Sequence, residues 1–436
     1  MDRFDYYVDM LSELEPIQVY GRIVQVVGLV IESIGPASSI GDLCTIRSRR
    51  TKSVFKAEVV GFRENRVLLM PLDACEGIAP GDEVIANVGG FNVNVGDGLL
   101  GRVINGFGEP IDGKGPLEGT RKRSVFNQPP DPMLKKRVDQ PMITGIRSID
   151  GLITCGKGQR AGIFAGSGVG KSTLLGMIAR NTEADVNVIG LIGERGKEVR
   201  DFLERDLGEA GLQRSVVVVV TSDKPALLRV KGAFVATTIA EYFRNQGRDV
   251  MLMMDSITRV AMAQREIGLA VGEPPTTRGY TPSVFSMLPR LLERSGTADC
   301  GSITGLYTVL VEADDMNEPV ADSVRSILDG HIVLSRRLAA MNHYPAIDIL
   351  ESVSRVMTDV ISPDQKKLVK RFLQLLAIYR EAEDLIRIGA YVKGTDEKID
   401  AAISKISALN NFMQQDVFER VAFKQVLEQL QQVVGS

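Results

Sequence analysis

The chain has 436 residues and a formal net charge of −3, with 44% hydrophobic and 25% charged residues. This mixture is typical of a globular protein and excludes a mostly disordered chain, a collagen and a disulfide scaffold. The slight acidity argues against a nucleic-acid-binding protein, which usually carries a basic excess.

Neither a membrane span nor a signal peptide is predicted. The longest apolar runs, at 216–220 and 250–255, are far shorter than the ~20 residues that a span needs. The first sixteen residues are acidic and interrupted, unlike a signal peptide. We therefore expect a cytoplasmic protein. Its four cysteines form no CxxC pair, so free thiols are expected rather than a zinc or redox site.

The first sixteen residues contain one short helix pattern. Apolar residues recur at helical spacing over 4–14, and Pro16 ends the pattern. So short a helix needs something to pack on. Residues 1–16 either dock on the following domain or form a partner-binding arm, and we expect the arm.

Residues 17–90 change to short strands rich in Val and Ile and bounded by Gly, Pro, Asn and Asp. Several such strands in seventy residues predict a small closed β-barrel. Residues 89–150 are rich in glycine and proline, and apolar residues recur through them. We expect an ordered connector that wraps a domain.

From residue 150 to residue 345, apolar runs alternate with helical patterns. This alternation predicts an α/β domain with a mostly parallel sheet covered by helices, and we assign 91–361 to it. The predicted strands are RAGIFAG, DVNVIGLIG, SVVVVVTS, DVMLMMDS, SITGLYTVLVE and HIVLS.

The tail, 362–436, is predicted to be an all-helical bundle. Ser362 followed by Pro363 and Gln365 has the spacing of a capping box with proline at the first helical position. Later helices are expected at 399–413 and 417–434.

A glycine-rich segment between a predicted strand and a predicted helix indicates a phosphate-binding loop. Residues 165–172 read AGSGVGKS, which matches GxxxxGK[ST] except that Ala165 replaces the first glycine. Glycines let the loop point its N–H groups at phosphate oxygens, and the helix presents its positive end to the same anion. Lys171 is expected to hold the β- and γ-phosphates, and the Ser172 hydroxyl to ligate Mg²⁺. The expected nucleotide contacts here are Ala165, Gly166, Ser167, Gly168, Val169, Gly170, Lys171, Ser172 and Thr173.

Carboxylates end two other predicted strands. Asp255 and Glu194 both fall at the carboxyl edge of the sheet, where ligands bind in such folds. Asp255 is expected near the metal, and Glu194 as the base for the attacking water. Glu198 would share the helical face of Glu194 if a helix starts there.

Longer strings resemble a known family. PAIDILESVSR at 345–355 is similar to the signature of the α/β subunits of rotary ATP synthases. The phosphate loop, GERGKEVR at 193–200 and MDSITR at 254–259 match that family in order and spacing. The strings at 261–296 and 314–339 resemble its type III protein-export branch, and the resemblance covers nearly the whole chain.

The resemblance implies roles for further residues. Glu194 matches the catalytic glutamate that orients and deprotonates water, and Arg195 and Glu198 match polar neighbours of that site. Arg259 matches an arginine near the γ-phosphate.

Two other matches lie around residue 350. Tyr344 matches an aromatic residue that stacks on adenine. Arg355 matches the arginine finger, which reaches the γ-phosphate bound by the neighbouring subunit. The family's second adenine contact has no match in the tail.

The resemblance implies Mg²⁺-dependent hydrolysis of ATP to ADP and phosphate by a homohexamer. This would energise flagellar type III export by unloading or unfolding substrates at the membrane export gate. Implied partners are a stator-like regulator at the N-terminal arm, a central stalk-like protein, export-gate membrane proteins and chaperone–cargo complexes. The ring would lie at the cytoplasmic face of the inner membrane export apparatus.

Four alternatives to flagellar export remain. A virulence-type secretion ATPase shares most of the strings, whereas the catalytic subunit of an ATP synthase is disfavoured by 261–296 and 314–339. Glu194 argues against a non-catalytic nucleotide-binding ring subunit. The net charge and the acidic N-terminus oppose an RNA translocase.

Overall fold

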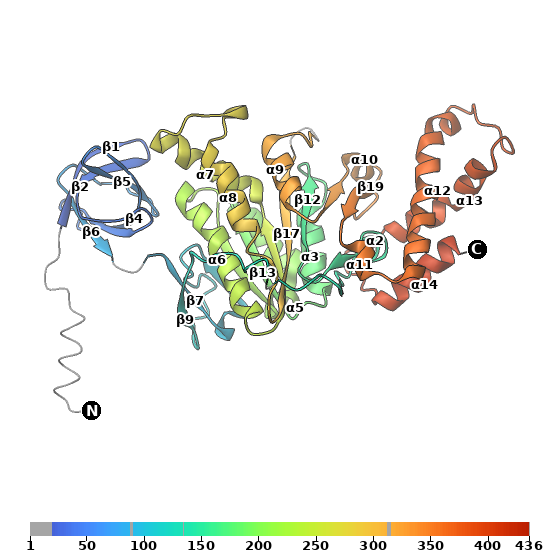
Figure 1. The fold of residues 1–436 in the computed structure, drawn as a ribbon, viewed down its shortest axis with the longest axis horizontal. Coiled ribbons are helices and arrows are strands. Elements are labelled where there is room, and N and C mark those ends of the chain that lie inside the picture. The colour runs from blue at the N-terminus through green and yellow to red at the C-terminus, as the bar shows by residue number, and fades with distance from the viewer. Residues whose placement is uncertain (1–19, 88–89, 134, 312–314, 436) are drawn as a thin grey trace.

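A closed six-stranded barrel comes first in this computed structural model, which describes residues 20–87, 90–133, 135–311 and 315–435 (Figure 1). Inward-pointing Val, Ile and Leu side chains fill it, and the barrel predicted from the sequence is confirmed. The expected arm and helix at 1–16 lie outside the described residues. Around the barrel the order is β1 (Tyr20–Val27), β2 (Val30–Ile34), β5 (Arg66–Pro71), β4 (Val54–Arg63), β3 (Leu43–Arg47) and β6 (Glu83–Asn87).

The central domain is built on a nine-stranded, mostly parallel sheet, as predicted. The strands are almost continuous runs of Val, Ile, Leu and Met because helices cover both of their faces. The order is β19 (Ile347–Ser354), β18 (Gly330–Leu334), β12 (Arg160–Ala165), β17 (Ser302–Leu310), β15 (Asp249–Asp255), β13 (Val186–Ile192), β14 (Ser215–Val220) and β8 (Arg102–Asn105), with β16 (Gly296–Thr297) beside β17.

In the strands at the centre of the sheet, alternate residues enter two separate cores, one on each face. In β13, for example, Val188 belongs to one core and Ile189 to the other. The first core is covered by α6 (Ala226–Arg244), α7 (Ile257–Val271), α8 (Pro282–Leu292) and α9 (Pro319–Ile327). The second is covered by α2 (Arg147–Leu152), α3 (Lys171–Asn181), α4 (Gly196–Asp201), the π-helical turn η2 (Phe202–Leu207) and α5 (Gly208–Gln213).

The segment 89–150 is more than a connector, which corrects the sequence-based expectation. Its β8 pairs with β14 and forms an edge of the central sheet. Its β7 (Asn92–Val95) and β9 (Arg121–Ser124) form a small antiparallel sheet, and β10 (Pro141–Met142) pairs with β11 (Cys155–Gly156). These strands are short and glycine-flanked, so their pattern is too weak to read from the sequence.

The tail forms the predicted helical bundle at the far end of the molecule from the barrel (Figure 1). Ser362 caps the first helix by accepting from the Gln365 N–H, but the Gln365 side chain bonds to 150–154 instead of completing a capping box. The last helix begins at Phe423, not at 417 as expected. The tail helices are α12 (Pro363–Arg387), α13 (Glu397–Met413) and α14 (Phe423–Val434), and short α10 (Arg336–Ala340) and α11 (Met357–Val360) precede them.

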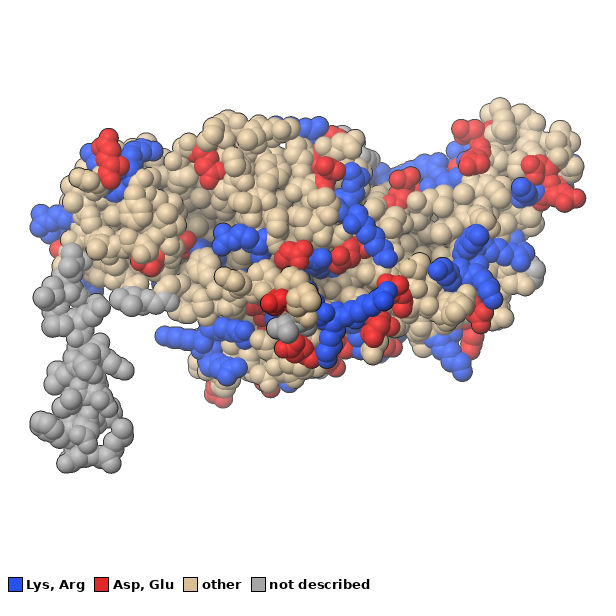
Figure 2. Space-filling view, in the orientation of Figure 1, with Lys and Arg blue, Asp and Glu red and all other residues tan. Residues whose placement is uncertain are grey.

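The surface shows no dominant sign of charge. On the face drawn in Figure 2, Lys and Arg are interspersed with Asp and Glu over the central domain. Within the described ranges, no helix is long and apolar enough to cross a membrane. The four cysteines are free thiols. Cys44 and Cys155 are buried, as expected for free thiols, but Cys75 is half-buried and Cys300 is exposed.

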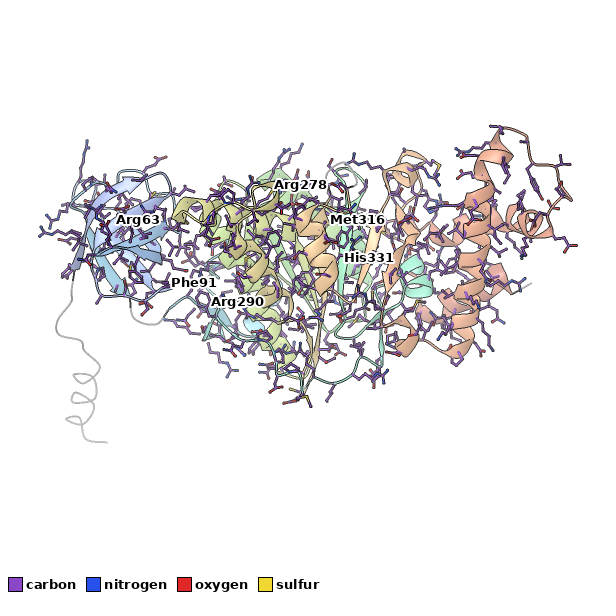
Figure 3. All side chains as sticks on the ribbon, turned by 45° about the horizontal axis from the view of Figure 1, so that its top comes forward. Arg63, Phe91, Arg278, Arg290, Met316 and His331 are labelled. Carbon is purple, nitrogen blue, oxygen red and sulfur yellow. The ribbon has the colours of Figure 1, made fainter. Side chains whose placement is uncertain are left out.

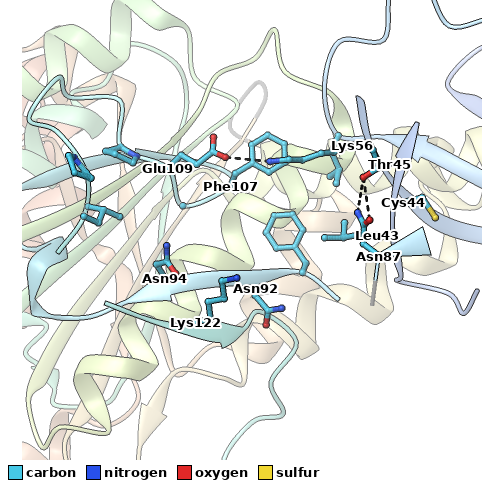
Figure 4. A pocket seen from close by; sticks show the side chains of 16 residues that line it. Leu43, Cys44, Thr45, Lys56, Asn87, Asn92, Asn94, Phe107, Glu109 and Lys122 are labelled. Carbon is cyan, nitrogen blue, oxygen red and sulfur yellow. Dashed lines mark hydrogen bonds and ion pairs between the residues drawn. The ribbon is translucent and has the colours of Figure 1, made fainter. Parts of the chain in front are cut away.

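A groove of about 680 Å³ lies between the barrel and the central domain. Phe91 lies at this joint (Figure 3). From the barrel, the Lys56 amine lies 4.4 Å from the centre of the Phe107 ring and 3.4 Å from Glu109 Oε1 (Figure 4). The joint is therefore held partly by polar contacts at its rim.

A buried ion pair crosses the same joint. Lys231 on α6 lies 2.8 Å from Glu58 Oε1 on β4, and both side chains are more than nine-tenths buried. The Lys231 amine also lies 4.1 Å from the centre of the Phe126 ring. Burial raises the pKa of Glu58 and lowers that of Lys231, so each charge depends on its partner.

Removing one member of this pair should therefore destabilise the protein. We expect Lys231→Met to lower the free energy of unfolding by about 3 kcal/mol, because Glu58 is left buried without a counter-charge. Urea unfolding followed by circular dichroism measures it. The matched control is Lys56→Met, which breaks an exposed pair at the same joint and should cost about 0–1 kcal/mol. Equal losses in the two variants would contradict the assignment.

Candidate functional site

The predicted phosphate loop joins the end of β12 to the start of α3. Gly168 and Gly170 take φ values of 78° and 90°, which side-chain-bearing residues rarely adopt. No side chain caps the first turn of α3. Its free N–H groups therefore stay available to an anion held in the loop.

Asp255 and Glu194 meet the loop at the same edge of the sheet. Asp255 is the last residue of β15, and Glu194 comes two residues after the end of β13. These two strands pair in parallel with Leu191 opposite Asp255, so both carboxylates lie at the same edge. The Lys171 amine lies 2.5 Å from Asp255 Oδ1 and 3.8 Å from Glu194 Oε1. Thr308, on β17 between β12 and β15, donates to Asp255 Oδ1 at 2.7 Å. Thr308 fixes the carboxylate, and no sequence motif pointed to it.

Glu194 is poised as a base. Its burial, followed by the charge of Asp255, raises its pKa to about 7, although Lys171 opposes the shift. Its protonated carboxyl group donates to Glu198, and this hydrogen bond lowers the pKa of Glu198. Glu194 Oε1 is buried without a hydrogen-bond partner among the described residues, which leaves it ready to accept from a water molecule.

A cleft of about 430 Å³ brings most of the predicted residues together. Two residues of the predicted phosphate loop do not line the cleft: Ala165 lines an adjoining cavity, and Val169 is buried in the core. Thr173 lines the cleft, and its hydroxyl group forms a hydrogen bond with Asp206. The cleft is lined by Gly166, Ser167, Gly168, Gly170, Lys171, Ser172, Thr173, Glu194, Arg195, Glu198, Arg259 and Leu310.

The two predicted arginines of the cleft differ in environment. Arg259 packs along Gly193, where an added Cβ would lie 2.8 Å from the Arg259 Cβ, and its Nε is buried without a partner among the described residues. Arg195 is 80% exposed and lies 4.0 Å from Glu198 Oε1. Arg259 is thus the better placed of the two to meet a phosphate inside the cleft.

Tyr344 lies beside the loop but outside the cleft lining. A Cβ added to Gly170 would lie 3.4 Å from Tyr344 Cε1. The Tyr344 carbonyl accepts from the Gln415 N–H at 3.0 Å, so the segment 415–418 of the tail lies beside it. In that segment, Phe418 is 77% exposed and lies under the guanidinium of Arg180.

Arg355 is far from the phosphate loop of its own chain. Strand β19 runs antiparallel to β18, so Ile347 lies opposite Leu334 at the loop edge and Ser354 lies opposite Gly330 at the other edge. Eight residues of strand separate the two ends by roughly 25 Å. Arg355 is exposed at the far edge, and the structure does not bring it to Glu194.

The donor set of the cleft fits a magnesium–phosphate complex. Ser172 supplies a hydroxyl that is exposed to the cleft. Asp255 supplies a carboxylate that does not line the cleft but lies buried directly behind Lys171. Mg²⁺ prefers such oxygen ligands, supplemented by substrate phosphates and water. Among the described residues, no group of three or more His, Cys, Asp or Glu side chains could hold a metal by itself.

Family models cover most of the chain. The description "ATP synthase alpha/beta family, nucleotide-binding domain" matches residues 145–354, and the β-barrel domain of the same family matches 23–87. The C-terminal domain of the type III secretion ATPase EscN matches 361–432.

Full-length relatives agree with these matches. The flagellum-specific ATP synthase of Bacillus subtilis is 55% identical over 430 residues, which is 98% of both chains. The type 3 secretion system ATPase of Xanthomonas euvesicatoria is 51% identical over 95% of this chain and 94% of its own. The assembled ATPase EscN of enteropathogenic E. coli superimposes with a TM-score of 0.90 at 48% identity, covering 95% of this chain and 100% of its own.

Proposed function

Because this chain belongs to the ATP synthase α/β family, in the branch of flagellum-specific and type III secretion ATPases, we propose that it hydrolyses ATP to drive protein export through a flagellar type III apparatus. The observation that carries the proposal is the meeting of Lys171, Asp255 and Glu194 around a phosphate loop. Lys171 and Glu194 line one cleft, and Asp255 lies directly behind Lys171.

Each group has one task in the reaction. The loop and Lys171 bind the phosphates, and Ser172 with Asp255 would hold Mg²⁺, which neutralises phosphate charge when it is bound. Glu194 in its ionised form orients a water molecule and accepts its proton, and the protonated carboxyl group that results is held by its hydrogen bond to Glu198. Arg259 meets the γ-phosphate from the side of Gly193, and Arg195 carries positive charge at the exposed mouth. The adenine ring packs on Tyr344, and the segment 415–418 bounds the base site.

The position of Arg355 supports action between subunits. It is exposed at the sheet edge opposite to the loop, where a neighbouring copy could bring its own loop. A closed ring of identical chains, which we propose to be a homohexamer, places one such contact at every interface. EscN has been solved in an assembled form, which supports assembly here.

Further partners follow from the family. EscN has also been solved in complex with its central stalk EscO, and we propose a stalk-like partner for this chain. We propose a stator-like regulator at residues 1–16, and export-gate proteins with chaperone–cargo complexes at the cytoplasmic face of the inner membrane. A virulence-type secretion system is the second candidate, since relatives of that kind reach 51% identity. Two flagellar relatives at 55% and 52% favour the first.

The nucleotide site is tested by Lys171→Ala. We expect affinity for a fluorescent ATP analogue to fall by about ten- to hundredfold, because the phosphates lose a charge-assisted contact. Titration at fixed salt and Mg²⁺ measures it. Lys197→Ala is the matched control, since Lys197 is an exposed lysine near the cleft that does not line it. Unchanged affinity in Lys171→Ala would contradict the proposed site.

A further inference from the structure

Arg336 reaches the phosphate loop from α10, an element to which the sequence assigned no site residue. It is the first residue of α10, directly after β18 and Ser335. Strand β18 pairs with β12 so that Leu334 lies opposite Ala165, the residue that opens the loop. Arg336 therefore emerges at the same sheet edge as the loop.

The guanidinium of Arg336 lies against Gly166. A Cβ added to Gly166 would lie 2.6 Å from both Nε and Nη2 of Arg336, and 3.0 Å from Cζ. Unlike Gly168 and Gly170, Gly166 does not take a positive φ. The glycine therefore leaves space for the guanidinium, which an added Cβ would displace.

Arg336 also lines the cavities on both sides of this contact. One, of about 510 Å³, includes Ala165, Ser167 and Arg259. The other, of about 210 Å³, includes Gly166 and ends against β18. The arginine side chain thus lies across the start of the loop and braces it from outside the nucleotide cleft.

We propose that Arg336 is a positioning residue for ATP binding, whose planar guanidinium holds the phosphate loop in its binding shape through contact with Gly166. The inference rests on the proposed function and deepens it. A loop with three glycines has many accessible conformations, and binding must select one of them. A rigid, planar group packed on the loop removes part of that cost before the nucleotide arrives.

The test is a double-mutant cycle in the full-length protein. Arg336→Ala removes the brace, and Gly166→Ala displaces it by filling its space. If both act through one contact, the double variant should be no worse than either single variant. Arg337→Ala is the matched control, because Arg337 is the next residue and pairs instead with Glu383 on α12.

The readouts are ADP-analogue affinity, KM for ATP, kcat and Tm. We expect Arg336→Ala and Gly166→Ala each to weaken binding and raise KM about tenfold. For Arg336→Ala, kcat at saturating ATP should stay within about twofold of wild type. The double variant should also lose about tenfold, and Arg337→Ala should bind as wild type does.

Several results would overturn the inference. The first is unchanged nucleotide affinity in Arg336→Ala. The second is a double variant whose affinity is about a hundredfold below that of wild type, which would mean that the two effects multiply. The third is a loss of Tm in Arg336→Ala well beyond that in Arg337→Ala, which would indicate a structural role. A wild-type chain that binds no nucleotide would overturn the proposed function as well. If the wild-type chain binds nucleotide and Arg336→Ala binds it equally well, only this inference is overturned.

Discussion

Replacing Glu194 by glutamine should lower the rate of ATP hydrolysis by roughly 10²–10⁴-fold while ATP binding persists. Glutamine keeps the shape of the side chain but cannot accept a proton from water. The phosphate contacts of Lys171 and the loop remain, so affinity for an ATP analogue should stay near that of wild type. Steady-state phosphate release and analogue titration measure the two properties separately.

The pH dependence of kcat/KM is a second test of the role of Glu194. A carboxyl group with a pKa of about 7 is protonated at lower pH and cannot act as a base. In wild type, kcat/KM should therefore rise with pH, with its midpoint at about 7, and level above that, since this ratio reports groups of the free enzyme. The residual activity of Glu194→Gln should lack this step.

The matched control is Glu204→Gln. Glu204 is an exposed glutamate that pairs with Arg200 on the same side of the domain, and its loss should leave turnover unchanged. Activity of Glu194→Gln within a few-fold of wild type would show that another group activates the water.

Arg355→Ala should lower turnover by about 10³–10⁵-fold, the range known for arginine fingers in phosphoryl transfer. The physical reason is the loss of a guanidinium that neutralises charge in the transition state. Because Arg355 lies roughly 25 Å along β19 from the loop edge, it can serve only a site in another copy of the chain. Activity of wild type should accordingly rise cooperatively with protein concentration as subunits assemble.

Mixing two inactive variants tests this arrangement directly. In a ring containing both Glu194→Gln and Arg355→Ala chains, some interfaces pair an intact Glu194 with an intact Arg355 from the neighbour. Partial activity should reappear on mixing. The controls are each variant alone at the same total concentration, together with light scattering of the mixture to confirm co-assembly. A co-assembled mixture that stays inactive would contradict the action of Arg355 in a neighbouring site.

Much of the architecture could be predicted from the sequence because its signals are local. The apolar segments that form β12, β13, β14 and β15 are bounded by turns and buried on both faces. Their composition therefore predicts buried strands. The phosphate loop was recognisable because its spacing follows from one strand, one turn and one helix.

Other features depend on contacts between distant residues and left no local pattern. The edge strand β8 has four residues, and it is recognised as a strand only through its pairing with β14 in the folded sheet. Thr308 and Arg336 meet the site only because β17 and β18 flank β12. The helix expected from 417 starts at Phe423, since the preceding residues contact Tyr344 and Arg180 instead of continuing a helix.

Strand β19 has a mechanical consequence for an assembled ring. It begins three residues after Tyr344, beside the phosphate loop, and ends immediately before Arg355, which is exposed at the opposite edge. Tyr344 and Arg355 are thus joined by one continuous strand that is hydrogen-bonded to β18. A displacement of Tyr344 on base binding would therefore move the arginine offered to the next subunit.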